Sequence, residues 1–115
     1  MITGDGEQLM GMGSLLTIAA KKPANLTIVV LDNGHFGETV QVSHSGLGAR
    51  LDVIATGAGL RSVTEIADLK SAADFRPKLQ RIDGGPRLAR IRIATGHHER
   101  ALPPRDGAFL KNRFR

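Results

Sequence analysis

The chain has 115 residues, of which 41% are hydrophobic, and this is enough for one domain with a packed core. It has no cysteine and no run of about 18 apolar residues, so disulfides are excluded and no membrane-spanning helix is expected. Most of the net charge of +5 comes from residues 100–115, where basic side chains outnumber the single carboxylate of Asp106. We therefore expect a cytoplasmic protein with a globular domain at 1–96 and a basic tail at 97–115.

Two apolar strands with a helix between them are predicted for the first third of the chain. Residues 1–3 form the first strand, which ends at Gly4-Asp5-Gly6, where glycines permit a tight turn. Apolar residues recur at helical spacing over 7–22, which predicts one largely buried helix that ends before Pro23. The β-branched run at 26–31 is typical of a strand that is covered on both faces.

The rest of the domain alternates between helices and strands. Residues 35–48 have little apolar periodicity and are expected to form a loop that covers a ligand site at the ends of the strands. A short helix is predicted over 51–58 and a strand over 61–66. A second helix should run from 67 to about 80, kinked or split by its proline. Alternation over 87–95 predicts an edge strand with one wet, basic face.

The order of these elements predicts the fold class. The series β-α-β-loop-α-β-α-β is typical of an α/β fold with three layers, in which helices cover both faces of a doubly wound, mostly parallel sheet. The first strand begins at Met1 with no helix before it. We therefore expect the fold to be incomplete at its N-terminus, or to be completed by a partner.

Polar residues that can bind a cation follow the first two strands. Asp5 comes directly after the first strand and Asn33 after the second. Open α/β sheets bind ligands at the carboxyl ends of their strands, and Mg²⁺ prefers oxygen ligands together with phosphate oxygens and water. We expect Asp5, Asn33 and the backbone carbonyl of His35 to form half a coordination shell. The N–H groups of Gly6 and Glu7, at the start of the helix, would then face a diphosphate.

A Gly-Asp-Gly turn followed after about 26 residues by an asparagine, each after an apolar strand, resembles the signature of thiamine diphosphate-dependent enzymes. The resemblance implies a thiamine diphosphate-binding fold with Mg²⁺ held by Asp5, Asn33 and His35. It also implies a cofactor site formed by nine residues: Gly4, Asp5, Gly6, Glu7, Asn33, Gly34, His35, Phe36 and Gly37.

Three segments look most like phosphonopyruvate and sulfopyruvate decarboxylases. They are residues 31–39, 43–46 and 103–107. The resemblance implies a carbon-carbon lyase that removes CO₂ from a small 2-oxo acid with a second anionic group. The titratable groups of the 35–48 loop, which are His35, Glu38 and His44, are the candidate catalytic residues; each could equally be an ordinary polar loop residue.

Complete enzymes of this family have a second, pyrimidine-binding domain that supplies an activating glutamate. Nothing in this sequence has that role, so the resemblance implies a partner domain or subunit, a homo- or hetero-oligomer, and no activity for the chain alone. One alternative is a carboligase of the acetolactate synthase type, which would use the same cofactor residues. Another is a non-catalytic nucleotide- or nucleic-acid-binding α/β module with a basic tail. The low aromatic content, 3%, provides few stacking surfaces and makes nucleic acid the weaker hypothesis.

Overall fold

The computed structural model describes residues 1–37, 39–96 and 104–113. The strands within them are β1 (Ile2–Gly4), β2 (Thr27–Asp32), β3 (Ser62–Ile66) and β4 (Arg87–Arg92). The helices are α1 (Asp5–Met10), α2 (Ser14–Lys21), α3 (Leu51–Gly57), α4 (Leu69–Phe75) and α5 (Gly107–Arg113), with the 3₁₀ helix η1 (Arg76–Lys78). Within these described ranges, no helix has the length and apolar character needed to cross a membrane.

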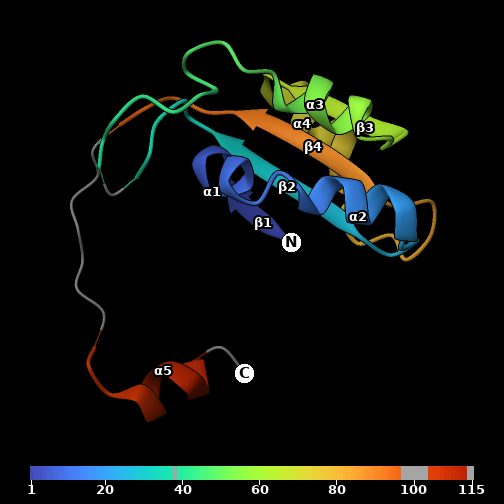
Figure 1. The fold of residues 1–115 in the computed structure, drawn as a ribbon. Coiled ribbons are helices and arrows are strands. Elements are labelled where there is room, and N and C mark those ends of the chain that lie inside the picture. The colour runs from blue at the N-terminus through green and yellow to red at the C-terminus, as the bar shows by residue number, and fades with distance from the viewer. Residues whose placement is uncertain (38, 97–103, 114–115) are drawn as a thin grey trace.

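The four strands form one parallel sheet in the order β1-β2-β4-β3. The chain moves in one direction along the sheet from β1 to β2 and on to β3, and then reverses to insert β4. Parallel connections are right-handed, so the reversal places α4 on the opposite face from α2 and α3 (Figure 1). The predicted three-layer α/β fold is therefore confirmed.

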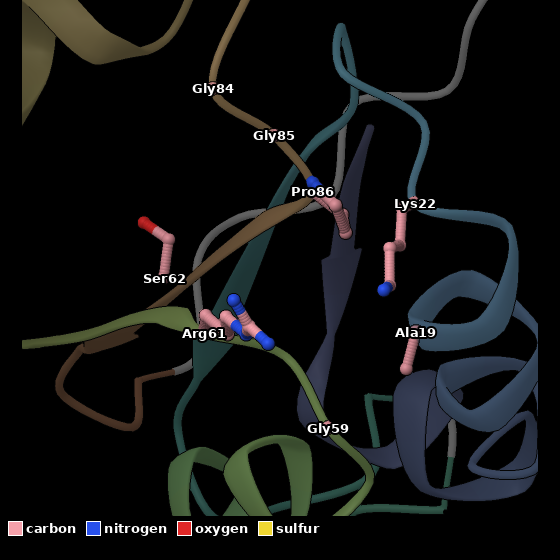
Figure 2. A pocket seen from close by; sticks show the side chains of 8 residues that line it. All are labelled: Ala19, Lys22, Gly59, Arg61, Ser62, Gly84, Gly85 and Pro86. Carbon is pink, nitrogen blue, oxygen red and sulfur yellow. The ribbon is translucent and has the colours of Figure 1, made fainter.

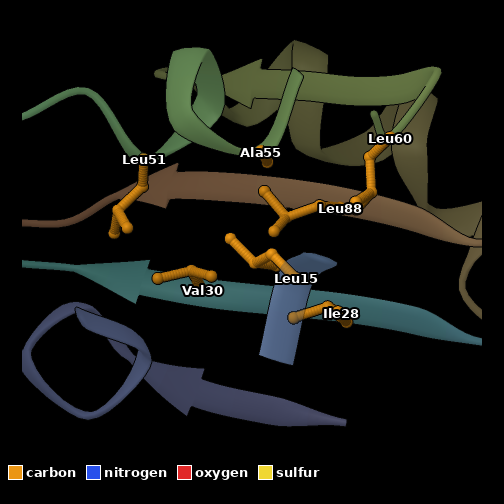
Figure 3. Close-up of a cluster of buried hydrophobic side chains, with 7 residues drawn as sticks. All are labelled: Leu15, Ile28, Val30, Leu51, Ala55, Leu60 and Leu88. Atoms are coloured by element: carbon orange, nitrogen blue, oxygen red, sulfur yellow. The ribbon is translucent and has the colours of Figure 1, made fainter. Parts of the chain in front are cut away.

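The core lies on both faces of the sheet because successive strand residues point in opposite directions. On one face, Leu15 of α2 packs between the strands and α3 (Figure 3). The other face is covered by α4 through Phe75. The first cluster consists of Leu15, Ile28, Val30, Leu51, Ala55, Leu60 and Leu88, and the second of Val29, Ile66, Phe75 and Ala89. Each fully buried aliphatic side chain contributes about 1.5–3 kcal/mol to stability.

The single helix predicted over 7–22 is wrong, because the chain forms two helices here. α1 ends before Gly11, a turn follows, and α2 begins after Gly13. The Ser14 hydroxyl donates to the Gly11 carbonyl at 2.7 Å, and this bond competes with helical continuation. Two glycines within three residues cost roughly 1 kcal/mol each in a helix, which is enough to break it at this point.

The prediction for the fourth strand is also wrong in one respect. β4 is not an edge strand, because it pairs with both β2 and β3. Its expected wet, basic face forms only in part, since Arg87 and Arg90 are only 4% and 6% exposed, whereas Arg92 is exposed. Residues three apart on a strand point to opposite faces, and each arginine is buried among its own acceptors. Arg87 donates to the Thr27 hydroxyl and to backbone carbonyls near η1, whereas Arg90 contacts Asp32.

Other boundaries follow the predictions closely. Asp68 caps α4 by accepting a hydrogen bond from the Ser71 N–H at 2.7 Å. The α-helix ends at Phe75, and the 3₁₀ helix η1, which contains Pro77, follows directly. In the basic tail, Asp106 accepts hydrogen bonds from the first turn of α5. Figure 1 shows α5 apart from the sheet. The tail prediction for 97–103 and 114–115 lies outside the described residues.

Candidate functional site

The register of the sheet brings the two predicted ligand segments to the same edge. Gly4, the last residue of β1, pairs with Leu31 of β2, so Asp5 and Asn33 both follow the strands at this edge. A cavity of about 670 Å³ opens here. Eight of the nine residues predicted to bind the cofactor line it: Gly4, Asp5, Gly6, Glu7, Asn33, His35, Phe36 and Gly37.

Asp5 is held at the start of α1 with its carboxylate beside the loop that follows β2. It is only 2% exposed. Its Oδ2 accepts a hydrogen bond from the hydroxyl of Ser43, which is fully buried. No side chain caps the first turn of α1, whose N-cap residue is Gly4 in an extended conformation. Among the described residues, the carboxylate has one hydrogen-bond donor, and Asp5 also lines the cavity.

Asn33 and His35 form a local turn that fixes both residues. The Asn33 Oδ1 accepts the His35 N–H at 2.9 Å, and the His35 Nδ1 lies 3.1 Å from the Asn33 carbonyl. An amide oxygen has two lone pairs, so Oδ1 can still accept a second partner. Within the described part of the chain, no group donates a hydrogen bond to the His35 carbonyl. Both predicted oxygen ligands therefore have capacity for a cation.

The loop after β2 is more ordered than the sequence predicts. His35 bridges to Val42 in antiparallel fashion, the Phe36 N–H donates to the Gln41 carbonyl at 2.9 Å, and the Ser43 N–H donates to the Gly34 carbonyl at 2.8 Å. Residues 34–37 and 39–43 are therefore the two arms of a small hairpin, which we call the site hairpin. Its backbone bonds return the chain to the strand ends, so Ser43 can contact Asp5.

Two glycines permit this close packing. A Cβ on Gly6 would overlap the ring of Phe36, so only glycine lets the site hairpin lie against the first turn of α1. Gly34 has φ +70°, a left-handed conformation that favours glycine, and it lies against Gly46. Gly34 is the predicted cofactor residue that does not line the cavity; it supports the hairpin behind it.

A buried ion pair fixes the end of β2. The Asp32 Oδ2 lies 2.5 Å from the Arg90 Nε and accepts the Ser45 hydroxyl at 2.5 Å, while its Oδ1 accepts the Gly34 N–H at 3.1 Å. Burial alone would raise the pKa of Asp32, but the hydrogen bonds from Ser45 and Arg90 and the charge of Arg90 outweigh it and lower the pKa. Asp32 is therefore a charged structural anchor.

Sequence reasoning did not assign Asp32, Ser45 or Arg90 to this edge of the sheet. The three-residue spacing between Arg87 and Arg90 is the signal that could have shown it. That spacing rules out a shared face on a strand, so at least one arginine had to point inward toward a carboxylate.

The charges around the cavity decide which ligands it can accept. Asp5 and Glu7 both line it, and Glu7 is oriented by the Thr3 hydroxyl at 2.6 Å. No lysine or arginine is found among the described residues that line it. The described residues also contain no group of three or more His, Cys, Asp or Glu that could bind a metal. The acidic lining would therefore repel an anion that entered alone, whereas the carboxylate, amide and carbonyl oxygens are groups that can bind a cation.

The three candidate catalytic residues have different positions. His35 lines the cavity. His44 is exposed and is not among the lining residues, and its carbonyl accepts the Ala49 N–H at 2.8 Å. Glu38 lies outside the described residues. Catalytic roles for all three remain predictions.

A second cavity, of about 290 Å³, lies near the opposite edge of the sheet. Lys22 and Arg61 extend into the same space there, beside Pro86 (Figure 2). None of the predicted site residues lines it. Lys22 follows the last residue of α2, a position where positive charge stabilises the helix dipole. This explains the position of Lys22 without a ligand.

Comparisons with known proteins agree with the geometry. A family model described as "Thiamine pyrophosphate enzyme, C-terminal TPP binding domain" matches residues 1–88. A sulfopyruvate decarboxylase subunit beta from Methanocaldococcus jannaschii is 43% identical over 65 residues, which cover 56% of this chain and 35% of that protein. A phosphonopyruvate decarboxylase from Streptomyces viridochromogenes is 33% identical over 116 residues, which cover 100% of this chain and 29% of that protein.

A second sulfopyruvate decarboxylase subunit beta, from Methanothermobacter thermautotrophicus, is 30% identical over 115 residues, which cover 99% of this chain and 58% of that protein. The chain thus spans less than two thirds of the length of each of these three relatives. Because the family model matches most of the chain, the protein belongs to the thiamine pyrophosphate enzymes, within the family of their C-terminal TPP-binding domains.

Proposed function

We propose that this chain is the diphosphate- and Mg²⁺-binding part of a thiamine diphosphate-dependent 2-oxo acid decarboxylase. The observation that carries the proposal is the arrangement of Asp5, Asn33 and His35 around one cavity, in a chain of the matching family. The names of the relatives support a small substrate with a second anionic group, such as phosphonopyruvate or sulfopyruvate.

The acidic lining of the cavity supports the requirement for a metal ion. Asp5 and Glu7 would repel a diphosphate that entered alone, and no described lining residue carries a compensating positive charge. Mg²⁺ reverses this repulsion because it binds protein and phosphate oxygens together. We infer that the Asp5 carboxylate, the Asn33 amide oxygen and the His35 carbonyl would hold it.

Thiamine diphosphate, when bound, supplies the electron sink that lets a 2-oxo acid lose CO₂. The residues of this chain would anchor and enclose its phosphate end. Phe36 and Gly37 of the site hairpin line the cavity opposite α1 and would exclude water from the ion. His35, Glu38 and His44 are retained as candidate proton carriers at the substrate end.

The complete site requires a second contributor in this proposal. A pyrimidine-binding domain or subunit would supply the activating glutamate, so the active form would be a homo- or hetero-oligomer. Two relatives are named as beta subunits, which supports a site shared between chains. We therefore expect the chain alone to bind the cofactor weakly and to release no CO₂.

Calorimetric titration of thiamine diphosphate into the 115-residue chain, with and without Mg²⁺, tests the proposal. Binding should need the metal and should be lost in Asp5→Asn, which keeps the shape of the side chain but removes its charge. Asp74→Asn, an exposed change on α4, is the matched control and should bind normally. Equal affinity with and without Mg²⁺ would refute the proposed role of the metal.

Product analysis tests the reaction. With a pyrimidine-binding partner added, we expect phosphonopyruvate or sulfopyruvate to give CO₂ and an aldehyde. A longer hydroxyketone would instead indicate a carboligase, and no turnover of either substrate with any such partner would contradict the substrate assignment.

A further inference from the structure

Two serines of one short segment contact the two strand ends that border the cavity. Ser43 donates its hydroxyl hydrogen to Asp5, and Ser45 donates to Asp32, the residue before Asn33. Only one residue separates the two serines. We propose that Ser43 and Ser45, which we call the serine clamp, are positioning residues that set the placement of Asp5 relative to Asn33. This inference deepens the proposed function and rests on it.

The hydroxyl of Ser43 is itself held in place. Its oxygen lies 3.4 Å from the Gly46 N–H, and its backbone N–H donates to the Gly34 carbonyl at 2.8 Å. A serine hydroxyl has one hydrogen to donate, and Ser43 gives it to Asp5. The Asp5 carboxylate is thereby tied to the base of the site hairpin.

Ser45 connects the same segment to the centre of the sheet. Its hydroxyl oxygen accepts the Arg90 Nη2 at 3.1 Å while it donates to the Asp32 Oδ2 at 2.5 Å. Asp32 also accepts the Gly34 N–H through its other oxygen. The side-chain links therefore run in series from Asp32, which Arg90 of β4 also contacts, through Ser45 to Ser43 and finally to Asp5.

A Mg²⁺ site needs this precision. The ion demands near-octahedral geometry, with oxygens at about 2.0–2.1 Å, so a small shift of one ligand weakens binding. Asp5 follows β1 and Asn33 follows β2, and the serine clamp joins these two strand ends through side chains. A purely structural explanation is that each serine only satisfies a buried carboxylate. The two explanations differ in how the effects of the two serines combine.

The test measures the Kd for thiamine diphosphate at saturating Mg²⁺ in the full chain. Ser43→Ala and Ser45→Ala should each weaken binding about tenfold, the value of one hydrogen bond to a charged group. Because the links are in series, breaking one releases the constraint. The double variant should therefore bind about as weakly as either single variant, not as the product of the two losses.

Conservative and distant variants complete the design. Ser45→Thr keeps the hydroxyl and should bind as the wild type does. Ser62→Ala, at the other edge of the sheet and with no recorded side-chain hydrogen bond among the described residues, is the matched control and should also bind normally. If Ser43→Ala does not fold, Ser45→Ala and Ser45→Thr carry the comparison.

The outcomes separate the clamp from the proposed function. Wild-type affinity in both alanine variants, or multiplicative losses in the double variant, would overturn the clamp. Absence of Mg²⁺-dependent binding to the wild type would overturn the proposed function instead. In that event, amide hydrogen exchange of the ligand-free chain decides about the clamp. Ser45→Ala should speed exchange at Ser43 and Phe36 without affecting β2 and β4, and unchanged exchange would overturn the inference.

Discussion

One aspartate lies at the end of β1 and another at the end of β2, and the two differ in their surroundings. Asp5 and Asp32 lie at the same edge of the sheet and are 2% and 5% exposed. Asp32 has a guanidinium, a hydroxyl and a backbone N–H as partners, and it lines none of the cavities described above. In the described part of the chain, the Asp5 side chain has one hydroxyl as its hydrogen-bond partner, and Asp5 lines the large cavity. Under the proposed function, the remaining coordination capacity of a carboxylate, and not its position at a strand end, distinguishes a metal ligand from a structural anchor.

The largest expected loss of stability comes from breaking the ion pair that holds Asp32. Arg90→Met leaves Asp32 buried without its cation, and breaking a buried pair in this way costs about 3–5 kcal/mol. Urea unfolding measures the loss. Arg50→Met is the control, because Arg50 is exposed and its ion pairs with Asp52 and Glu65 lie at the surface. If Arg90→Met loses no more stability than Arg50→Met, Asp32 is not a structural anchor and does not differ from Asp5 in this way.

A substitution at Gly6 should disrupt the packing between the first turn of α1 and the site hairpin. In Gly6→Ala the new methyl group overlaps the Phe36 ring, and we expect a loss of about 1–3 kcal/mol with a displaced site hairpin. Gly13→Ala is the matched control, since a Cβ there meets nothing within 4 Å and alanine restricts the unfolded chain. Thermal unfolding of the two variants gives the comparison, and a Gly6→Ala protein as stable as Gly13→Ala would contradict the packing.

Acid protonates Asp32 and Asp52, two carboxylates that arginines hold in place, and so tests their contribution to stability. Burial opposes but does not cancel the Ser45 and Arg90 contacts that lower the pKa of Asp32, and the hydrogen bond from Arg50 is the main cause that lowers the pKa of Asp52 to about 2. A depressed pKa means that the folded state holds the proton less tightly than the unfolded chain does. Stability is therefore full above pH 3.8 and falls as the pH drops toward about 2.

The measurement for this prediction is the free energy of unfolding as a function of pH. The loss between pH 3.8 and about 2 should be smaller in Asp52→Asn, which has no carboxyl group to protonate at that position. An identical pH dependence in the variant and the wild type would show that the contacts of Asp52 do not couple its protonation to folding.

The smallest expected effect on stability is that of Asp5→Asn. The amide oxygen can still accept the Ser43 hydroxyl, and a neutral group costs less to bury than a charge, so stability should change by less than about 1 kcal/mol. Chemical denaturation of the metal-free chain checks this. A large loss of stability would place Asp5 in the same structural class as Asp32.

Much of the fold could be predicted from the sequence because its signals are local. The β-branched run of β2, the helix breaker Pro77 and the start of α4 each depend on near neighbours, and each lies close to its expected place. β4 was misplaced because its position in the sheet depends on contacts with residues almost 60 positions away. Arg90 and Asp32 are the clearest example, since neither shows its partner in the sequence.

The residues of the site also divide into those with a local signal in the sequence and those that depend on distant contacts. Asp5 and Asn33 could be proposed from their positions after two strands, and both line the same cavity. The contact between Ser43 and Asp5 spans 38 residues and depends on the site hairpin, whose backbone bonds leave little trace in the periodicity of the sequence. The hydroxyl contacts that hold Asp5 and Asp32 therefore had to come from the structure.

The central claim is that Asp5 holds a metal ion against the diphosphate of the cofactor. Paramagnetic broadening of the ³¹P signals of thiamine diphosphate, with Mn²⁺ in place of Mg²⁺, tests it most directly. The account predicts strong broadening in the presence of the wild-type chain beyond that of cofactor and Mn²⁺ alone, and no such addition with Asp5→Asn. The same added broadening in the presence of Asp5→Asn would contradict it.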